Sequence, residues 1–220
     1  MNLPTKITFS RIIAIVVMIL TLVVLYFVKI FNPSFEIPCI PHTGINWLYF
    51  GLFVFFLIAS FTDFLDGYLA RKNNQVTDLG KFLDPVADKL LINSMVIFLI
   101  VPAAYAKMDA SVAPHGQLAF SLWCAIILVA RDIVVDALRF IAAQKGVVIA
   151  ANIFGKLKTV FEMIAVCLVL LNGWPFIYFD GGWHNSLRIA SWMVYAATLM
   201  SLISGIIYVI QNRHVFKESK

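Results

Sequence analysis

Residues 12–28 read IIAIVVMILTLVVLYFV, an apolar run that contains no charged side chain. A helix needs about 20 predominantly apolar residues to cross the hydrocarbon core of a bilayer. Further uncharged stretches follow along the chain, at residues 43–62, 90–106, 118–130, 163–179 and 189–212. This repetition predicts an integral membrane protein built from helices.

The expected fold is all-α, with six transmembrane helices at about residues 8–30, 45–71, 81–106, 117–143, 156–178 and 188–212. We expect one membrane domain over residues 1–220, because no polar or low-complexity tract marks a second domain. Of the 220 residues, 61% are hydrophobic and only 13% are charged, which excludes an ordinary soluble domain.

The positions of the basic residues predict an orientation. One side of the membrane is expected to hold Lys6, Arg11, Arg71, Lys72, Lys81, Arg139, Lys145, Lys156, Lys158, Arg213, Lys217 and Lys220, and the other side only Lys29, Lys107 and Arg188. Since Lys and Arg concentrate in cytoplasmic loops, we predict that both termini face the cytoplasm. The net charge of +5 is expected to serve this topology and to attract anionic lipid head groups. Nucleic acid is not an expected partner of so apolar a chain.

The most informative polar segment is residues 63–88, where two expected helices meet on the cytoplasmic side. Asp63 and Asp66 are spaced i and i+3 near the end of one helix, and Asp84 and Asp88 are spaced i and i+4 near the start of the next. Each pair therefore shares one helical face. Four converging carboxylates would repel one another, and carboxylate oxygens suit Mg²⁺ or Mn²⁺. We expect divalent cations, since two of them would balance the four charges and would suit phosphoryl displacement.

Gly67 and Arg71 add a second indication within the same segment. Gly67 leaves a gap in the helix surface where a nucleobase or ribose could approach the backbone. Arg71, one turn later, offers a planar group that binds phosphate well. Metal, arginine and open backbone together favour a nucleotide diphosphate site. Taken singly the residues have plainer explanations, because an Asp near a helix end is often an N-cap and a small residue in a membrane helix often serves close packing.

The complete pattern is D-x2-D-G-x2-A-R-x8-G-x3-D-x3-D, and residues 63–88 fill every fixed position. It resembles the signature of the CDP-alcohol phosphotransferase family, membrane enzymes of phospholipid synthesis. The resemblance implies that Asp88 is the general base and also lies close to one metal. The metal ligands that it implies are Asp63, Asp66 and Asp84.

The resemblance also implies a CDP pocket, lined by Asp66, Gly67, Ala70, Arg71 and Gly80. The opening segment at residues 2–11, with Thr5 and Thr8, is similar to the start of many family members and is expected to help close over the nucleotide. Activity in this family is transfer of a phosphatidyl group from CDP-diacylglycerol to a small alcohol at the cytoplasmic face of the cell inner membrane. A homodimer is expected on the same basis.

The residues expected to bind the acceptor lie in the second half of the chain. Arg131, Asp132, Asp136 and Arg139 give one expected helix an unusually charged character, and Lys156 and Lys158 open the next helix. These segments resemble the family members whose acceptor is sn-glycerol 3-phosphate, although bacterial members usually carry Glu where Asp132 stands. We therefore expect the acceptor phosphate to contact Arg131, Lys156 and Lys158, with Arg139 as a weaker candidate.

Several alternatives remain open at this point. The charges of the fourth expected helix could form a ladder or satisfy one another between helices, and the two lysines could be topology anchors. Other members of the family make cardiolipin, phosphatidylserine or phosphatidylinositol phosphate. A cation transporter would also bury aspartates, but near the midplane and in repeated halves. Here the carboxylates gather at one face and no repeat is visible.

Overall fold

The computed structural model describes residues 3–72, 78–101, 111–145 and 153–212; the side chains of residues 3–4, 66, 68–71, 78–79 and 81–82 lie outside this described part. Its long helices are α1 (Leu3–Phe31), α2 (Trp47–Lys72), α3 (Asp78–Phe98), α4 (Leu122–Gln144), α5 (Ile153–Leu170) and α7 (Ile189–Gln211). The short elements are β1 (Cys39–Ile40), β2 (Ile45–Asn46), α6 (Ile177–Asp180) and the 3-10 turn η1 (Asn185–Leu187). The prediction of a mostly helical protein is confirmed, with a small antiparallel hairpin of β1 and β2 added.

Three described helices are long and apolar enough to cross a membrane, at Thr5–Phe31, Trp47–Leu65 and Ile189–Gln211. The helices α3, α4 and α5 carry more charged residues per length than these three spans, so six crossings remain a prediction. Large apolar side chains are nevertheless exposed on the outside of the bundle; Phe31 is 84% and Phe179 82% exposed. Apolar surface this extensive is rare on soluble monomers and is what lipid covers in a membrane protein.

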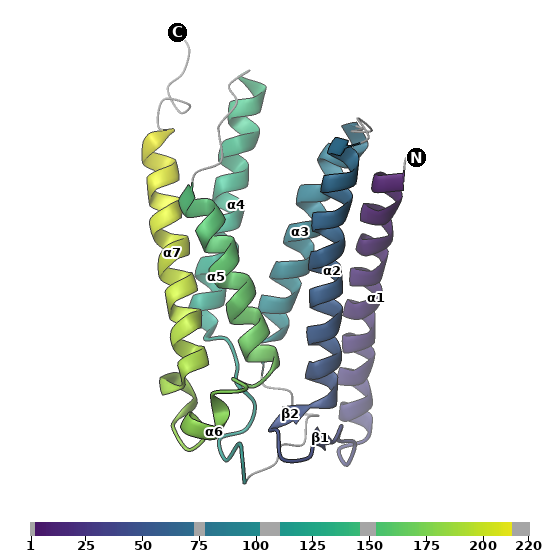
Figure 1. The fold of residues 1–220 in the computed structure, drawn as a ribbon, viewed down its shortest axis with the longest axis vertical. Coiled ribbons are helices and arrows are strands. Elements are labelled where there is room, and N and C mark those ends of the chain that lie inside the picture. Colours follow the sequence, from purple (N-terminus) through teal and green to yellow (C-terminus); the bar gives the residue numbers. More distant parts are fainter. Residues whose placement is uncertain (1–2, 73–77, 102–110, 146–152, 213–220) are drawn as a thin grey trace.

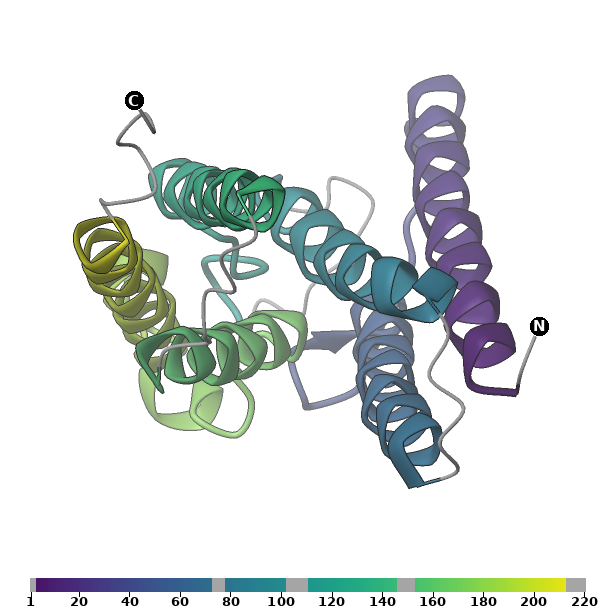
Figure 2. The ribbon, with the colours of Figure 1, turned by 90° about the horizontal axis from the view of Figure 1, so that it is seen from above.

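The long helices form two groups of three (Figures 1 and 2). In one group α1 packs against α2 and α3, and in the other α7 packs against α4 and α5. The start of α1 and the end of α7 lie at one end of the bundle, here called the polar end (Figure 1). The elements β1, β2 and α6 lie at the opposite end, here called the hairpin end. Both groups contribute to one apolar core, which includes Ile15, Tyr49, Phe56, Met95, Leu128, Val169 and Val194.

Several predicted helix boundaries were wrong. The helix expected to reach residue 178 ends at Leu170, because Asn172 and Gly173 adopt φ angles of 52° and 80°. The Gly173 N–H then donates to the Leu168 carbonyl at 2.7 Å, a bond that typically closes a helix at a left-handed residue. Helix α4 starts at Leu122 rather than near residue 117, because the Phe120 N–H donates to the Leu99 carbonyl instead of to a helical partner. The third expected helix, predicted to reach residue 106, ends as α3 at Phe98 and is followed by a turn at residues 99–100; residues 102–106 lie outside the described part.

Asn172 ties together the loops of the hairpin end. Its side chain is fully buried, and its Nδ2 donates to the Gly44 carbonyl at 2.9 Å. Its Oδ1 accepts from the Leu118 N–H at 2.8 Å and from Arg188 Nη1 at 3.3 Å. Arg188 is itself buried and also donates through Nη2 to the Asn172 carbonyl. One amide therefore connects the hairpin, the start of the segment before α4 and the start of α7.

Replacing Asn172 with Ala should lower the free energy of unfolding by at least about 3 kcal/mol, because several buried groups lose their partners at once. The measurement is thermal or denaturant unfolding of the purified protein in detergent. Asn212→Ala is the control, since within the described part of the chain that amide bonds to the Tyr208 carbonyl of the same helix and to no distant segment. Equal losses in the two variants would contradict this role of Asn172.

Candidate active site

Two of the predicted metal ligands meet at a single turn of α1. The Thr8 hydroxyl donates to Asp84 Oδ1 at 2.9 Å, and Arg11 forms an ion pair with Asp63. Thr8 and Arg11 are three residues apart, so they share a face of α1. Asp63 on α2 and Asp84 on α3 therefore both lie beside α1 at the polar end. Thr5 is buried on the same helix.

Other members of the motif are placed only by their backbone. Asp66, Ala70 and Arg71 belong to α2, but their side chains lie outside the described part. Gly67 lies in α2 and Gly80 in the first turn of α3. The convergence of all four aspartates and the contacts of the predicted CDP pocket thus remain predictions.

The described side chains include no group of three or more His, Cys, Asp or Glu residues close enough together to hold a metal ion. The side chain of Asp66 is not among those described. Asp63 and Asp84 do approach the same turn of α1, and all four motif side chains are hard oxygen donors. This donor chemistry fits Mg²⁺ or Mn²⁺ and disfavours softer metals.

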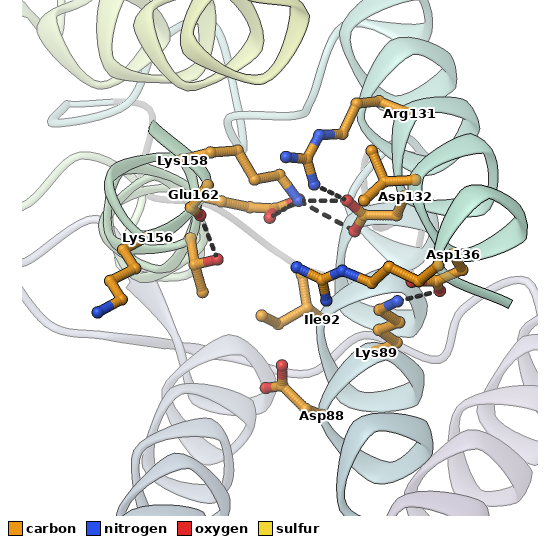
Figure 3. Close-up of a pocket in the computed structure, with 13 residues that line it drawn as sticks. Asp88, Lys89, Ile92, Arg131, Asp132, Asp136, Lys156, Lys158 and Glu162 are labelled. Carbon is orange, nitrogen blue, oxygen red and sulfur yellow. Dashed lines mark hydrogen bonds and ion pairs between the residues drawn. The ribbon is translucent and has the colours of Figure 1, made fainter. Parts of the chain in front are cut away.

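A polar cavity of about 230 Å³ lies next to these aspartates, between α3, α4 and α5 (Figure 3). Asp88 lines it from α3, one turn after Asp84. All of the predicted acceptor-binding cations also line it: Arg131, Arg139, Lys156 and Lys158. The structure therefore brings the predicted general base and the predicted phosphate ligands to one cavity, although they lie far apart in sequence.

Lys158 is the centre of a buried network on one wall of the cavity (Figure 3). Its Nζ donates to both oxygens of Asp132, each at 2.9 Å, and lies 2.5 Å from Glu162 Oε2. Arg131 donates to Asp132 Oδ1 at 3.0 Å and to the Ser204 hydroxyl of α7 at 2.7 Å. Since Lys158, Asp132 and Glu162 are almost completely buried, the pairing offsets a large desolvation cost.

The remaining charges of α4 also reach other helices. Asp136 forms an ion pair with Lys89 of α3. Arg139 Nε donates to the Tyr208 hydroxyl of α7 at 2.9 Å, and its guanidinium lies 5.5 Å from the centre of that ring. These contacts correspond to pairing between helices, the alternative to a ladder along α4.

The basic side chains of the cavity differ in whether they are already paired with a carboxylate. Arg131 and Lys158 are bound to Asp132, and Lys89 to Asp136. Within the described part of the chain, Arg139 and Lys156 form no ion pair with a carboxylate. Arg139, the weaker candidate from the sequence, is thus as well placed as the lysines to receive an anion.

Glu162, Ser204 and Tyr208 are site residues that the sequence analysis missed. Glu162 carried a usable signal, because an acidic residue four positions after Lys158 in an apolar helix shares the face of that lysine. Ser204 and Tyr208 carried none, since both lie in an uncharged stretch of an apolar helix.

The comparisons with known proteins agree with this arrangement. The profile of the CDP-alcohol phosphatidyltransferase family matches residues 1–212. A CDP-diacylglycerol–glycerol-3-phosphate 3-phosphatidyltransferase of Bacillus subtilis (strain 168) is 35% identical over 219 residues, 99% of this chain and 98% of the relative. The protein of the same name from Rickettsia bellii is 32% identical, with 94% of this chain and 93% of the relative aligned.

A third relative of that name, from Mycoplasma genitalium, is 38% identical over 71% of this chain and 61% of its own length. The fold and site are those of a membrane-embedded phosphotransferase, and the chain belongs to the CDP-alcohol phosphatidyltransferase family. The family prediction is confirmed. Members of this family generally depend on divalent metals.

Replacing Asp132 with Asn should destabilise the protein by about 3–5 kcal/mol, because Lys158 and Arg131 lose a buried partner together. Asp136→Asn is the matched control on the same helix. Its carboxylate is 41% exposed and its pair with Lys89 is partly solvated, so its loss should cost at most about 1 kcal/mol. Unfolding in detergent measures both, and a control as unstable as Asp132→Asn would contradict the assignment of the network.

Proposed function

We propose that this protein transfers the phosphatidyl group of CDP-diacylglycerol to sn-glycerol 3-phosphate, giving phosphatidylglycerophosphate and CMP. The observation that carries the proposal is the single cavity lined by Asp88 and by Arg131, Arg139, Lys156 and Lys158. A base beside several cations suits an acceptor that has both a hydroxyl and a phosphate. The names of the three relatives support the same substrates.

We place the polar end at the cytoplasmic face of the cell inner membrane, with six crossing helices and both termini in the cytoplasm. The support is the excess of Lys and Arg on that side and the exposed apolar surface around the bundle. Lipid tails would then stay in the bilayer while the nucleotide and the acceptor meet at the cytoplasmic surface. We expect a homodimer from the family resemblance.

Asp63, Asp66 and Asp84 would hold two divalent ions, either Mg²⁺ or Mn²⁺. Asp88 would be a further carboxylate beside one of them. Bound there, the metal would neutralise charge on the pyrophosphate of the donor and on the departing CMP. Arg11 and Thr8 hold Asp63 and Asp84 in place from α1, which limits the reorganisation needed on binding. The CDP would lie along Gly67, Ala70, Arg71 and Gly80, with Thr5 and Thr8 at its edge.

Asp88 would act as the general base. Its carboxylate faces the cavity, where it would accept the proton of the acceptor hydroxyl as that oxygen attacks the phosphorus next to the diacylglycerol. The new bond joins this phosphorus to the acceptor oxygen, and the bond that breaks releases CMP. Positioning and electrostatic stabilisation supply most of the acceleration in such transfers.

The acceptor phosphate would lie among the cations of the opposite wall. Arg139 and Lys156 are the most available, because Asp132 already occupies Arg131 and Lys158. A dianionic phosphate would add a second partner to Arg131 and Lys158 or compete with Asp132 for them. An acceptor without a phosphate, such as glycerol or serine, would leave Arg139 and Lys156 without a phosphate to bind.

Removal of divalent metal with EDTA should abolish CMP release, and Mg²⁺ or Mn²⁺ should restore it. Asp63→Asn and Asp84→Asn should each lower turnover at least about 100-fold, and each should weaken Mn²⁺ binding measured without lipid substrate. The control is Glu36→Gln, a carboxylate exposed near the hairpin end that should change neither property. Full activity in metal-free buffer would exclude the metal proposal.

Lys156→Ala and Arg139→Ala should raise the KM for glycerol 3-phosphate by about ten- to a hundredfold, as expected for loss of a charge-assisted hydrogen bond. The KM for CDP-diacylglycerol should hardly change. Lys145→Ala, which removes a cation just beyond α4 and outside the cavity lining, is the control. Steady-state rates of CMP release with a panel of alcohols give these KM values. A wild-type preference for an uncharged alcohol would assign the protein to another branch of the family.

A further inference from the structure

Glu162 is a buried carboxylate that the proposed mechanism leaves without a role. It lies on α5, one helical turn after Lys158, and its side chain is fully buried. It nevertheless lines the polar cavity, and Figure 3 shows its carboxylate beside Lys158, on the side that faces Asp132. Its Oε2 lies 2.5 Å from Lys158 Nζ, and its Oε1 has no hydrogen-bond partner among the described residues.

The ion pair with Lys158 does not fully satisfy this carboxylate. An ammonium group has three N–H donors, and Lys158 directs two of them to the oxygens of Asp132. Glu162 Oε2 lies 2.5 Å from the same Nζ, as an ion pair. Oε1 is left with no donor from the described part of the chain, and a buried acceptor in that state is costly and uncommon. This atom would gain most from a ligand that donates a hydrogen bond.

The other carboxylates of the cavity are already assigned. Asp132 is bound by Lys158 and Arg131, Asp136 is paired with Lys89, and Asp88 is the proposed base for the attacking hydroxyl. Glycerol 3-phosphate carries two hydroxyl groups, of which only one attacks. Its second hydroxyl needs an acceptor in a cavity whose cations serve the phosphate.

We propose that Glu162 accepts a hydrogen bond from the non-reacting secondary hydroxyl of the acceptor and thereby selects a diol phosphate over a phosphate with a single hydroxyl. This inference rests on the proposed function and assigns the residue that recognises the second hydroxyl of the acceptor. The cations fix the phosphate, Asp88 receives the proton, and Glu162 fixes the rotation of the acceptor between them.

The test compares two acceptors with the full chain in detergent and CDP-diacylglycerol as donor. One acceptor is sn-glycerol 3-phosphate, and the other is 3-hydroxypropyl phosphate, which has the same phosphate and primary hydroxyl but no secondary hydroxyl. The wild type should prefer glycerol 3-phosphate by about ten- to a hundredfold in kcat/KM, the range of one hydrogen bond to a charged group. Glu162→Leu should lose most of this preference, because its kcat/KM falls for glycerol 3-phosphate and much less for the analogue.

Glu162→Gln is the matched variant, since its carbonyl oxygen still accepts a hydrogen bond and should retain part of the preference. If Glu162 had a purely structural role, its replacement would lower kcat/KM equally for both acceptors. The ratio of the two values would then stay unchanged, which would overturn the proposal. So would a wild type that does not distinguish the two acceptors, an outcome that is available even if Glu162→Leu does not fold. Activity with neither phosphate but with another alcohol would instead refute the proposed function, and the role of Glu162 with it.

Discussion

The ion pair between Lys158 and Asp132 fixes the half of the bundle that supplies the cations of the cavity. Both side chains are almost fully buried between apolar helices, where a charge without a partner costs several kcal/mol. Because Lys158 is on α5 and Asp132 on α4, only one relative register of these helices brings them together. Arg131 extends the same constraint to α7 through Ser204. Gly205 lets this arginine lie against α7, since a Cβ there would come within 3.0 Å of Arg131 Cγ.

The two groups of helices supply different chemistry to the site. The group of α1, α2 and α3 supplies carboxylates, which α1 holds through Thr8 and Arg11. The group of α4, α5 and α7 supplies cations, which α7 holds through Ser204 and Tyr208. The cavity lies where the groups meet, and Asp88 is the motif aspartate that faces it. In the proposed function, a donor bound on one group would react with an acceptor bound on the other.

The hairpin end holds the two groups of helices in a fixed arrangement. Asn172 and Arg188 connect the loops there, and the apolar core runs through both groups of helices. The polar end instead carries charged side chains at the boundary between the groups. We infer that the bundle is held at one end by buried amide and apolar contacts and is specialised at the other for anionic substrates.

The sequence alone was sufficient for the class of protein and for locating the motif of four aspartates. Long charge-free stretches need lipid or a buried core, and aspartates at i, i+3 and i, i+4 share a helical face whatever surrounds them. These are local properties, so residues 12–28 and the pattern from Asp63 to Asp88 could be read directly. The partners of the charged residues in the second half of the chain could not.

Lys158 meets a residue 26 positions away, and Arg131 meets Ser204 across 73 positions. Such pairs depend on the packing register of whole helices, which no short pattern encodes. The early end of α5 depends likewise on Asn172, whose left-handed backbone is accompanied by bonds to Gly44 and Leu118 from distant segments. Local spacing therefore indicated which residues are candidates for the chemistry. The tertiary structure decided which cations are already paired with carboxylates, and it left Glu162 lining the cavity.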